Sequence, residues 1–367
     1  MQRQRRLNRK SGASARFPLG KSTVPVQKET VCTIERSLFM NRRFLNRIIS
    51  MLLCVSLFAC ICSSSVLASA EDGDSAERDF ITIAEHNAET GQTTYETIDL
   101  RPHRQTRAAA SQEEIYPGYS PAQQDSGVLA STALPPSTDP VPTQGIKNWS
   151  SVDNVNIMPY SSVVLITATI QGNISANSAT GFLLGPDVIL TAGHVVLGTP
   201  EYPVTSFSIY TKHNSGSVTG YPKEPHDTYW YVVDFAENQT RDFDWAIIRT
   251  QNNVGASCGW FGFGRNDSFS NKSASIIGYL EDVKYWQRTA TGGKIHSDGT
   301  YMFKHNYETT SGFSGAPLYD SDRIVWGLYA YCGSLLTSPS CIRFDDFLFR
   351  AIVEHVDAGK AKYGCTS

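Results

Sequence analysis

Long helical patterns are scarce in this 367-residue sequence, and no internal repeat is visible. The first absence argues against a helical bundle, and the second against an array of stacked repeats. Gly, Ser, Thr and Tyr are plentiful, and apolar residues make up 41% of the chain, which suffices for a buried core. The composition therefore favours an all-β body.

A basic surface is absent from most of the chain. Residues 1–47 contain twelve Lys or Arg and two Glu, a net charge of +10. Because the whole chain has a net charge of −3, the remaining residues sum to −13. This balance argues against a nucleic-acid surface on the folded part, since such surfaces need clustered positive charge.

The first 70 residues have the order of a targeting sequence. Three arginines precede an apolar run over residues 48–62, and the small residues Ala68-Ser69-Ala70 follow. Charged, apolar and small-residue regions in this order are typical of a secretory signal peptide. We expect cleavage after Ala70 and secretion, with Met40 as the true start of the protein.

Two other interpretations of the apolar run stay open. The run is nearly long enough to span a bilayer, so it could remain uncleaved as a membrane anchor. Leu57-Phe58-Ala59-Cys60 could serve as a degenerate lipidation site, although Phe58 fits that pattern poorly.

Four cysteines follow the targeting sequence, and none of them forms a C-x-x-C pair. Structural zinc sites usually use such pairs, so we expect no metal and no cofactor. An even number of cysteines in an exported domain instead predicts two disulfides. Cys332–Cys341 with Cys258–Cys365 is one of three possible connectivities, and the sequence does not choose among them.

Residues 71–145 differ in composition from the rest of the chain. The stretch over 120–144 is rich in Pro, Ser, Thr and Ala, so it cannot bury enough apolar surface to fold and should be extended or disordered. Phe80–Leu100 alternates apolar and polar residues and predicts a small hairpin. In an exported chain such a segment is either a propeptide or a surface linker.

From residue 146 onward, short β-branched and aromatic runs alternate with turn signals. A count of about twelve strands fits two consecutive β-barrels, the first over residues 146–255 and the second over 256–367. Residues 345–356 predict a C-terminal helix that Gly359 ends. The predicted strands cover residues 162–170, 180–184, 188–191, 205–211, 229–234, 244–249, 273–280, 285–291, 301–305 and 324–331.

The strongest catalytic signal is G-F-S-G-A-P within Thr309–Pro317. A serine hydroxyl is a weak nucleophile until a base removes its proton and donors stabilise the oxyanion that forms. Gly312 can adopt a backbone conformation that aims its own N–H and that of Ser314 at one point, while Gly315 clears space. By itself this pattern also fits a simple turn between strands.

The segment V-I-L-T-A-G-H carries an apolar strand into small residues and ends on His194. Histidine titrates near neutrality, so it can accept a proton and return it. Small residues before it let the ring lie over a neighbouring element. A lone histidine after a strand is more often structural, and the Ala-Gly pair favours a catalytic role here.

Asp244 enters the apolar run W-A-I-I and must find a donor there, because an unpaired buried carboxylate is costly. A histidine Nδ1–H would be such a donor. Asp242 is the rival, since period two places it on the same strand face. It lies beside Arg241 and farther from the apolar run, so we favour Asp244.

These residues occur in the order His194, Asp244, Ser314, with gaps of 50 and 70 residues. Triad order differs between unrelated folds, and this one is of the chymotrypsin type. The motifs T-A-G-H, D-W-A-I-I and G-F-S-G-A-P closely resemble those of the trypsin-like serine protease superfamily. The resemblance covers about residues 146–360.

Within that superfamily the chain is most similar to the bacterial glutamyl-endopeptidase branch, which shares its P-Y, G-P-D and T-T-x-G-x-S-G-x-P patterns. The resemblance implies two six-stranded antiparallel β-barrels with the site in the cleft between them. It places His194 and Asp244 in the first barrel and Ser314 in the second. It also implies a prosegment removed on activation, with the mature start expected within residues 142–152.

The same resemblance implies a substrate-binding role for two positions. In that branch a Thr five residues before the nucleophile and a His fifteen residues after it hold the substrate's glutamate. Thr309 matches, whereas Tyr329 replaces the histidine and is a neutral donor at pH 7. An acidic preference is therefore implied only in part. His305 could compensate if it lies nearby, although a surface position is the simpler interpretation.

The sequence thus predicts a secreted serine endopeptidase that works through an acyl-enzyme on Ser314. We expect protein or peptide substrates, no nucleic acid, membrane contact only during export, and a monomer. Two alternatives remain: a trypsin-like fold that binds without cleaving, and a membrane-anchored extracellular protease.

Overall fold

The computed structural model describes residues 78–103, 113–121, 149–171, 176–266, 269–280, 285–299, 301–307, 311–331 and 340–365. The chain divides into two compact units, Met1–Glu71 and Asp72–Ser367, and every described residue belongs to the second. The predictions for the signal peptide, Thr309 and Cys332 fall outside the described residues.

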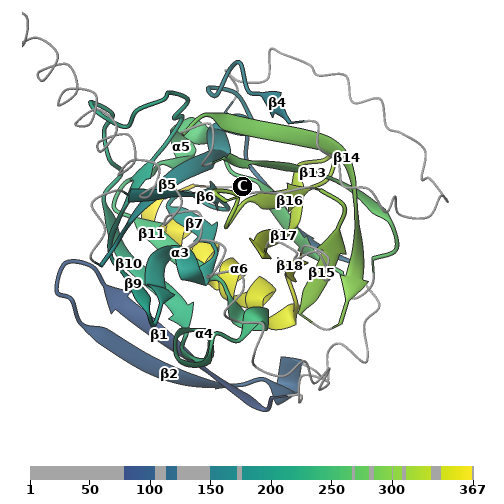
Figure 1. The fold of residues 1–367 in the computed structure, drawn as a ribbon. Coiled ribbons are helices and arrows are strands. Elements are labelled where there is room, and N and C mark those ends of the chain that lie inside the picture. The colour runs from purple at the N-terminus through teal and green to yellow at the C-terminus, as the bar shows by residue number, and fades with distance from the viewer. Residues whose placement is uncertain are drawn as a thin grey trace, which may run out of the picture. The chain divides into compact units, whose positions relative to one another are not determined.

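The first sheet of the described residues has nine strands in the order β2-β1-β10-β11-β7-β6-β5-β9-β8 (Figure 1). An antiparallel bridge between Ile209 and Glu224 joins the end of β9 to the segment that enters β10. The rings of Phe207 and His226 stack with centroids 4.3 Å apart across the same two strands. The strands are β1 Phe80–Asn87, β2 Thr93–Asp99, β5 Val163–Ile170, β6 Ala176–Leu183, β7 Val188–Thr191, β8 Gly198–Thr199, β9 Tyr202–Tyr210, β10 His226–Val232 and β11 Ala246–Thr250.

The second sheet closes into a six-stranded ring. Its order is β16-β13-β14-β15-β18-β17-β12-β3, and an additional pairing of β16 with β17 joins the ends of the first six strands. The short strand β4, Ser150–Ser151, pairs with β14. The strands are β3 Glu114–Tyr116, β12 Gly262–Arg265, β13 Lys272–Tyr279, β14 Gln287–Asp298, β15 Met302–His305, β16 Pro317–Tyr319, β17 Ile324–Tyr331 and β18 Ser340–Arg343.

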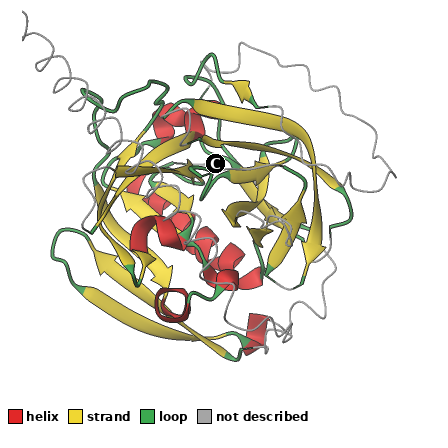
Figure 2. Ribbon diagram, in the orientation of Figure 1, coloured by secondary structure: helices red, strands yellow, loops and turns green. Residues whose placement is uncertain are grey.

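Helices are few among the described residues, as the sequence predicted (Figure 2). The longest is the C-terminal helix α6, Asp346–Tyr363, and Asp345 caps it by accepting a hydrogen bond from the Leu348 N–H at 2.9 Å. The others are α3 Gly193–Leu197, α4 Val233–Asn238, α5 Gly255–Cys258, η2 Tyr160–Ser162 and η3 Arg241–Phe243. The all-β fold class with a closing helix is therefore confirmed.

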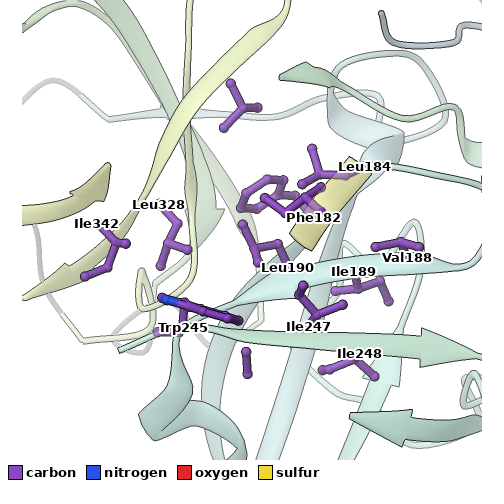
Figure 3. Packing of buried hydrophobic residues seen from close by; sticks show 14 of the residues in the cluster. Phe182, Leu184, Val188, Ile189, Leu190, Trp245, Ile247, Ile248, Leu328 and Ile342 are labelled. Atoms are coloured by element: carbon purple, nitrogen blue, oxygen red, sulfur yellow. The ribbon is translucent and has the colours of Figure 1, made fainter. Parts of the chain in front are cut away.

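One buried cluster of apolar residues extends across both sheets. Trp245, which is 3% exposed, belongs to it together with Leu190 of β7 and with Leu328 and Ile342 of the second sheet (Figure 3). Burial of large side chains is the main source of stability in such a core. Trp245 directly follows Asp244, so the core fixes the backbone next to that carboxylate.

Several strands lie where the sequence placed them. β7 and β17 match the predicted ranges to the residue, and the hairpin predicted over Phe80–Leu100 forms as β1 and β2. The end predicted for the C-terminal helix is wrong. Gly359 lies inside α6, where it is buried against the carboxylate of Asp187, and the helix ends at Gly364 with a φ of +63°.

The predicted disulfides do not form among the described cysteines. Cys258, Cys341 and Cys365 are all free. Cys258 and Cys341 are buried in two different apolar clusters, so packing holds the two thiols in separate parts of the interior. Burial raises the pKa of both thiols, which suits inert core cysteines.

Candidate active site

His194 lies on the short helix α3, directly after strand β7. The strand is buried, while the histidine side chain is 30% exposed to solvent. Ala192 and Gly193 make the turn from strand to helix, as the small residues of this motif suggested. A rigid strand thus presents a partly exposed imidazole, which is the placement a general base needs.

Asp244 contacts His194 at two points. Its Oδ2 lies 2.7 Å from the ring Nδ1, and its Oδ1 accepts a hydrogen bond of 2.7 Å from the His194 backbone N–H. The carboxylate is fully buried. A buried acid is tolerated only with such partners, and the backbone contact fixes the orientation of the acid against the helix that carries the base.

Asp244 and Asp242, the two candidate acids, differ in position. The sequence suggested one strand with both acids on the same face, and this part of the prediction is wrong. Arg241–Phe243 forms the 3-10 turn η3, and β11 begins only at Ala246. The turn leaves Asp242 half-buried, while Asp244 points to His194.

The environment of His194 adjusts its basicity. Burial lowers the pKa of the imidazole, but the charge of Asp244 and the hydrogen bond to it raise the pKa by more. The net shift is upward from the ordinary value of 6.5. Asp244 therefore stabilises the protonated ring that would form when the histidine accepts a proton.

Ser314 lies in a tight loop between Gly312 and Gly315. These glycines have φ angles of +99° and +84°, a region that L side chains rarely adopt. Thr180 of β6 ties the loop down: its Oγ1 donates to the Gly312 carbonyl at 2.8 Å, and its N–H donates to the Ser314 carbonyl at 2.9 Å. The backbone around the serine is thus fixed from the first sheet.

Gly315 shows how closely the serine loop approaches the histidine segment. A Cβ built on Gly315 would lie 2.1 Å from the Thr180 carbonyl oxygen, 2.3 Å from Thr191 Oγ1 and 3.0 Å from the Ala192 nitrogen. Ala192 is two residues before His194, so the structure brings the two motifs side by side. Within the described residues no hydrogen bond joins the two side chains themselves, a contact that often tightens only with substrate.

Two amide groups of the serine loop have no acceptor among the described residues. Within the part of the chain that the structure describes, neither the Gly312 nor the Ser314 N–H donates to a protein acceptor. The neighbouring amides are used, since Gly315 donates to the Tyr329 carbonyl at 2.7 Å and Ala316 to that of Phe313 at 2.7 Å. Two unused donors beside a serine are what an oxyanion site requires.

Sequence reasoning missed Thr180, which fastens the serine loop to β6. It is fully buried although polar, and its Oγ1 also accepts a hydrogen bond from the Tyr279 N–H at 3.0 Å. The available signal was a β-branched polar residue next to the apolar end of the strand, Phe182 and Leu183. The signal is weak, because buried threonines are common in β-sheets.

Tyr329 and His305 lie behind the serine loop. Tyr329 is 1% exposed, and its ring centroid lies 6.5 Å from that of Phe313, the residue before Ser314. The surface position considered for His305 is wrong: the residue is 3% exposed, with its ring 5.5 Å from that of Tyr329. The two side chains are therefore buried neighbours, and we call them the His305–Tyr329 pair.

The described residues contain no group of three or more His, Cys, Asp or Glu side chains that could hold a metal ion. No helix in the same part of the chain is both long and apolar enough to cross a bilayer.

The central part of the chain matches a known protein family. Residues 179–328 match the family model of the trypsin-like peptidase domain. This range includes His194, Asp244 and Ser314.

Two curated bacterial proteins are similar in sequence. The glutamyl endopeptidase of Bacillus licheniformis is 24% identical over 178 residues, which is 48% of this chain and 54% of that protein. A protein of Bacillus subtilis named extracellular metalloprotease is 24% identical over 177 residues, 48% of this chain and 56% of that protein. The chain thus spans about half the length of the curated relatives it matches.

A solved structure of a Glu endopeptidase in complex with MPD has the same fold. It superimposes with a TM-score of 0.50 at 22% sequence identity, and the match covers 59% of this chain and 99% of that chain.

Proposed function

We propose that this chain is an exported serine endopeptidase of the trypsin-like family, with Ser314 as nucleophile, His194 as general base and Asp244 as the residue that orients the base. One observation carries the proposal: Asp244 holds both the ring and the backbone of His194 at 2.7 Å while the serine loop packs against the same strand end.

The arrangement supports hydrolysis through an acyl-enzyme. Because Asp244 accepts from Nδ1–H, the unprotonated Nε2 is left to take the proton of Ser314 as the serine attacks the carbonyl carbon. The N–H groups of Gly312 and Ser314 would then stabilise the oxyanion. The protonated His194 donates its proton to the leaving amine, and a water molecule repeats the cycle on the ester.

Covalent labelling tests this assignment. A fluorophosphonate should modify the wild-type protein and the Ser321→Ala variant equally, because Ser321 is an exposed turn residue. Labelling should be lost in Ser314→Ala. Equal labelling of the two variants would reject Ser314 as the nucleophile. A wild type that does not label would instead favour a binding protein without peptidase activity.

We also propose that the enzyme prefers substrates with an acidic residue at P1, directly before the cleaved bond. The name of the Bacillus licheniformis relative supports it, and so does the buried His305–Tyr329 pair next to the serine loop. His305 Nδ1 accepts from the Tyr307 N–H at 3.1 Å, which places the ring proton on Nε2. That Nε2 is buried and has no protein partner among the described residues.

The unpartnered donor of this pair, His305 Nε2, is uncharged. Burial, with a smaller effect of His296, lowers the pKa of His305 to about 3, so the ring is neutral at physiological pH. A carboxylate held only by neutral donors keeps much of its desolvation cost, so the preference for Glu over Gln should be modest. A peptide-library cleavage profile measures this directly, and a profile dominated by basic or apolar P1 residues would reject the acidic preference.

Export is the remaining part of the proposal. The charged, apolar and small-residue order of the first 70 residues supports it, and the Bacillus subtilis relative is named as extracellular. Mass spectrometry of the N-terminus of secreted protein should show a start at Glu71 or later. Protein found only in the membrane fraction with an intact apolar run would instead support an anchored protease.

A further inference from the structure

Residues 78–121 precede the region that matches the peptidase family, yet they contribute strands to both sheets. We call the described parts of this segment, residues 78–103 and 113–121, the N-terminal clasp. β1 pairs with β10 over five positions, from Ile83 opposite Val232 to Asn87 opposite Thr228. β3 pairs with β12, with Tyr116 opposite Phe263.

The clasp fills part of the main core. Ile81 and Ala84 are 1% and 0% exposed, and Leu100 is 3% exposed. Ile81 and Leu100 belong to the same apolar cluster as the residues of β7 and β11. Because β1 also covers the backbone edge of β10, its removal would expose both apolar side chains and unpaired N–H and C=O groups.

Charged and polar contacts join the clasp to the C-terminal helix. Glu114 accepts hydrogen bonds from Arg350 of α6 at 2.6 and 2.7 Å and from Arg265 of β12 at 3.0 Å. His103 Nδ1 lies 2.7 Å from Asp346, where α6 begins. The Tyr116 hydroxyl donates to Asp357, about three turns farther along the helix than Asp346.

At Gly118 the backbone of the clasp lies in close contact with the backbone of the peptidase domain. Its neighbour Tyr119 exchanges two backbone hydrogen bonds with Trp260, each 2.9 Å long. A Cβ built on Gly118 would lie 2.3 Å from the Gly262 nitrogen and 2.7 Å from the Trp260 carbonyl oxygen. Only a glycine permits this contact, which indicates that the clasp and the peptidase domain are fitted to each other.

The start of the clasp also reaches the segment that carries Asp244. Arg78 forms an ion pair with Asp234 of α4, and its guanidinium lies 5.8 Å from the centroid of the Phe243 ring. Phe243 immediately precedes Asp244. The clasp therefore supports the backbone from which the orienting carboxylate projects.

We propose that the edges of β10 and β12, together with the outer face of α6, form a binding surface for the clasp, and that the clasp stays bound when the chain is cut between it and the first barrel. The resemblance to the glutamyl-endopeptidase branch implies a prosegment that leaves on activation. The contacts of residues 78–121 instead predict a two-chain protein in which the N-terminal fragment remains a structural part.

A site-specific cut tests this without relying on peptidase activity. A recognition sequence for an unrelated protease is inserted after Thr132 in full-length Ser314→Ala protein, and complete cutting is verified under denaturing conditions. Size-exclusion chromatography and native mass spectrometry at about 1 μM should then show both fragments in one complex, separated only by denaturant. Fragments that separate in native buffer overturn the proposal.

Two further variants of the cut protein check the surface. Gly118→Leu should weaken retention by about tenfold or more, since it forces a side chain into backbone contact. Thr94→Ala on the exposed outer strand β2 should leave retention unchanged. Should Gly118→Leu fail to fold, amide hydrogen exchange in the parent cut protein decides the matter: β1 amides stay protected if the clasp is bound and exchange freely if it is not.

Discussion

Asp244 fastens His194 by its ring and by its backbone at once, through hydrogen bonds of 2.7 Å from Nδ1 and from the main-chain N–H. The double contact means that the acid sets both the tautomer of the imidazole and the place of the helix turn that carries it. Removal of the carboxylate would therefore disturb both the imidazole and the helix turn, whereas asparagine keeps an oxygen that can accept from the main-chain N–H.

Asp244→Asn should lower kcat on a peptide substrate by about 10⁴-fold, because an amide cannot enforce the tautomer that leaves Nε2 unprotonated. Asp242→Asn is the matched control on the same short segment. Asp242 is half-buried and does not contact His194, so its variant should keep activity within a few-fold of wild type. Equal losses in the two variants would contradict the assignment of the orienting acid.

The pH dependence of kcat/KM should report His194. The imidazole must be neutral to accept the serine proton, so activity rises as the pH passes upward through its pKa. Burial lowers this pKa, but Asp244 raises it by more, so the rise should be centred above 6.5. An NMR titration of His194 in Ser314→Ala should give the same raised pKa, and Ser314→Ala/Asp244→Asn should lower it.

The same shift predicts a small effect on stability. Because the folded pKa of His194 is raised, the ion pair stabilises the folded protein fully below the unfolded pKa of 6.5. This contribution is lost as the pH rises through the folded pKa. If the acidic limb of the kcat/KM profile is centred well below pH 6.5, Asp244 does not raise the pKa of His194.

Gly315→Ala should abolish activity and lower stability by several kcal/mol, since its Cβ would lie 2.1 Å from the Thr180 carbonyl oxygen at a φ of +84°. Gly292→Ala is the control, because Gly292 has a similar φ of +80° but nothing within 4 Å of its Cβ position. It should lose only about 1–2 kcal/mol from backbone strain. Urea unfolding measures both, and equal losses would mean that close packing of the serine loop is unimportant.

Gly359→Ala should destabilise the protein, against the usual trend. In a helix interior alanine is ordinarily about 1 kcal/mol better than glycine. At position 359 the new Cβ would lie 2.3 Å from Oδ1 of Asp187, a fully buried carboxylate that accepts from Arg249 Nη2 at 2.8 Å. We expect a loss of about 1–3 kcal/mol.

Ala358, the exposed residue before Gly359, provides the control for this prediction. Ala358→Gly should cost about 1 kcal/mol through helix propensity alone. If Gly359→Ala proves stabilising in the same unfolding measurement, the packing of α6 on the buried carboxylate is not as tight as the structure shows.

Local sequence signals predicted those parts of the fold that short-range rules control. The β-branched and aromatic residues of β7 and β17 give their boundaries to the residue. The sequence offers Asp345 or Asp346 as the cap of α6, and Asp345 takes that role. The end of α6 could not be predicted, because Gly359 resembles a terminator unless its contact with Asp187 is known. Such tertiary contacts override local propensity.

Long-range pairing accounts for the other differences. The sequence of β12 is G-F-G-R, and two glycines in four residues do not predict a strand. The strand forms because β17 and β3 pair with it. Likewise, the composition before residue 146 indicated little structure, since nothing local shows that β1 will cover β10. Within the site, the motifs identified His194 and Ser314, whereas the role of Thr180 needed the structure.

The most direct test of the central proposal is the turnover of a peptide library by purified Ser314→Ala protein, compared with wild type under identical conditions. Wild type should cleave, and the variant should lose several orders of magnitude in kcat with its unfolding transition unchanged. Peptidase activity that survives in Ser314→Ala would contradict the assignment of Ser314 as the nucleophile.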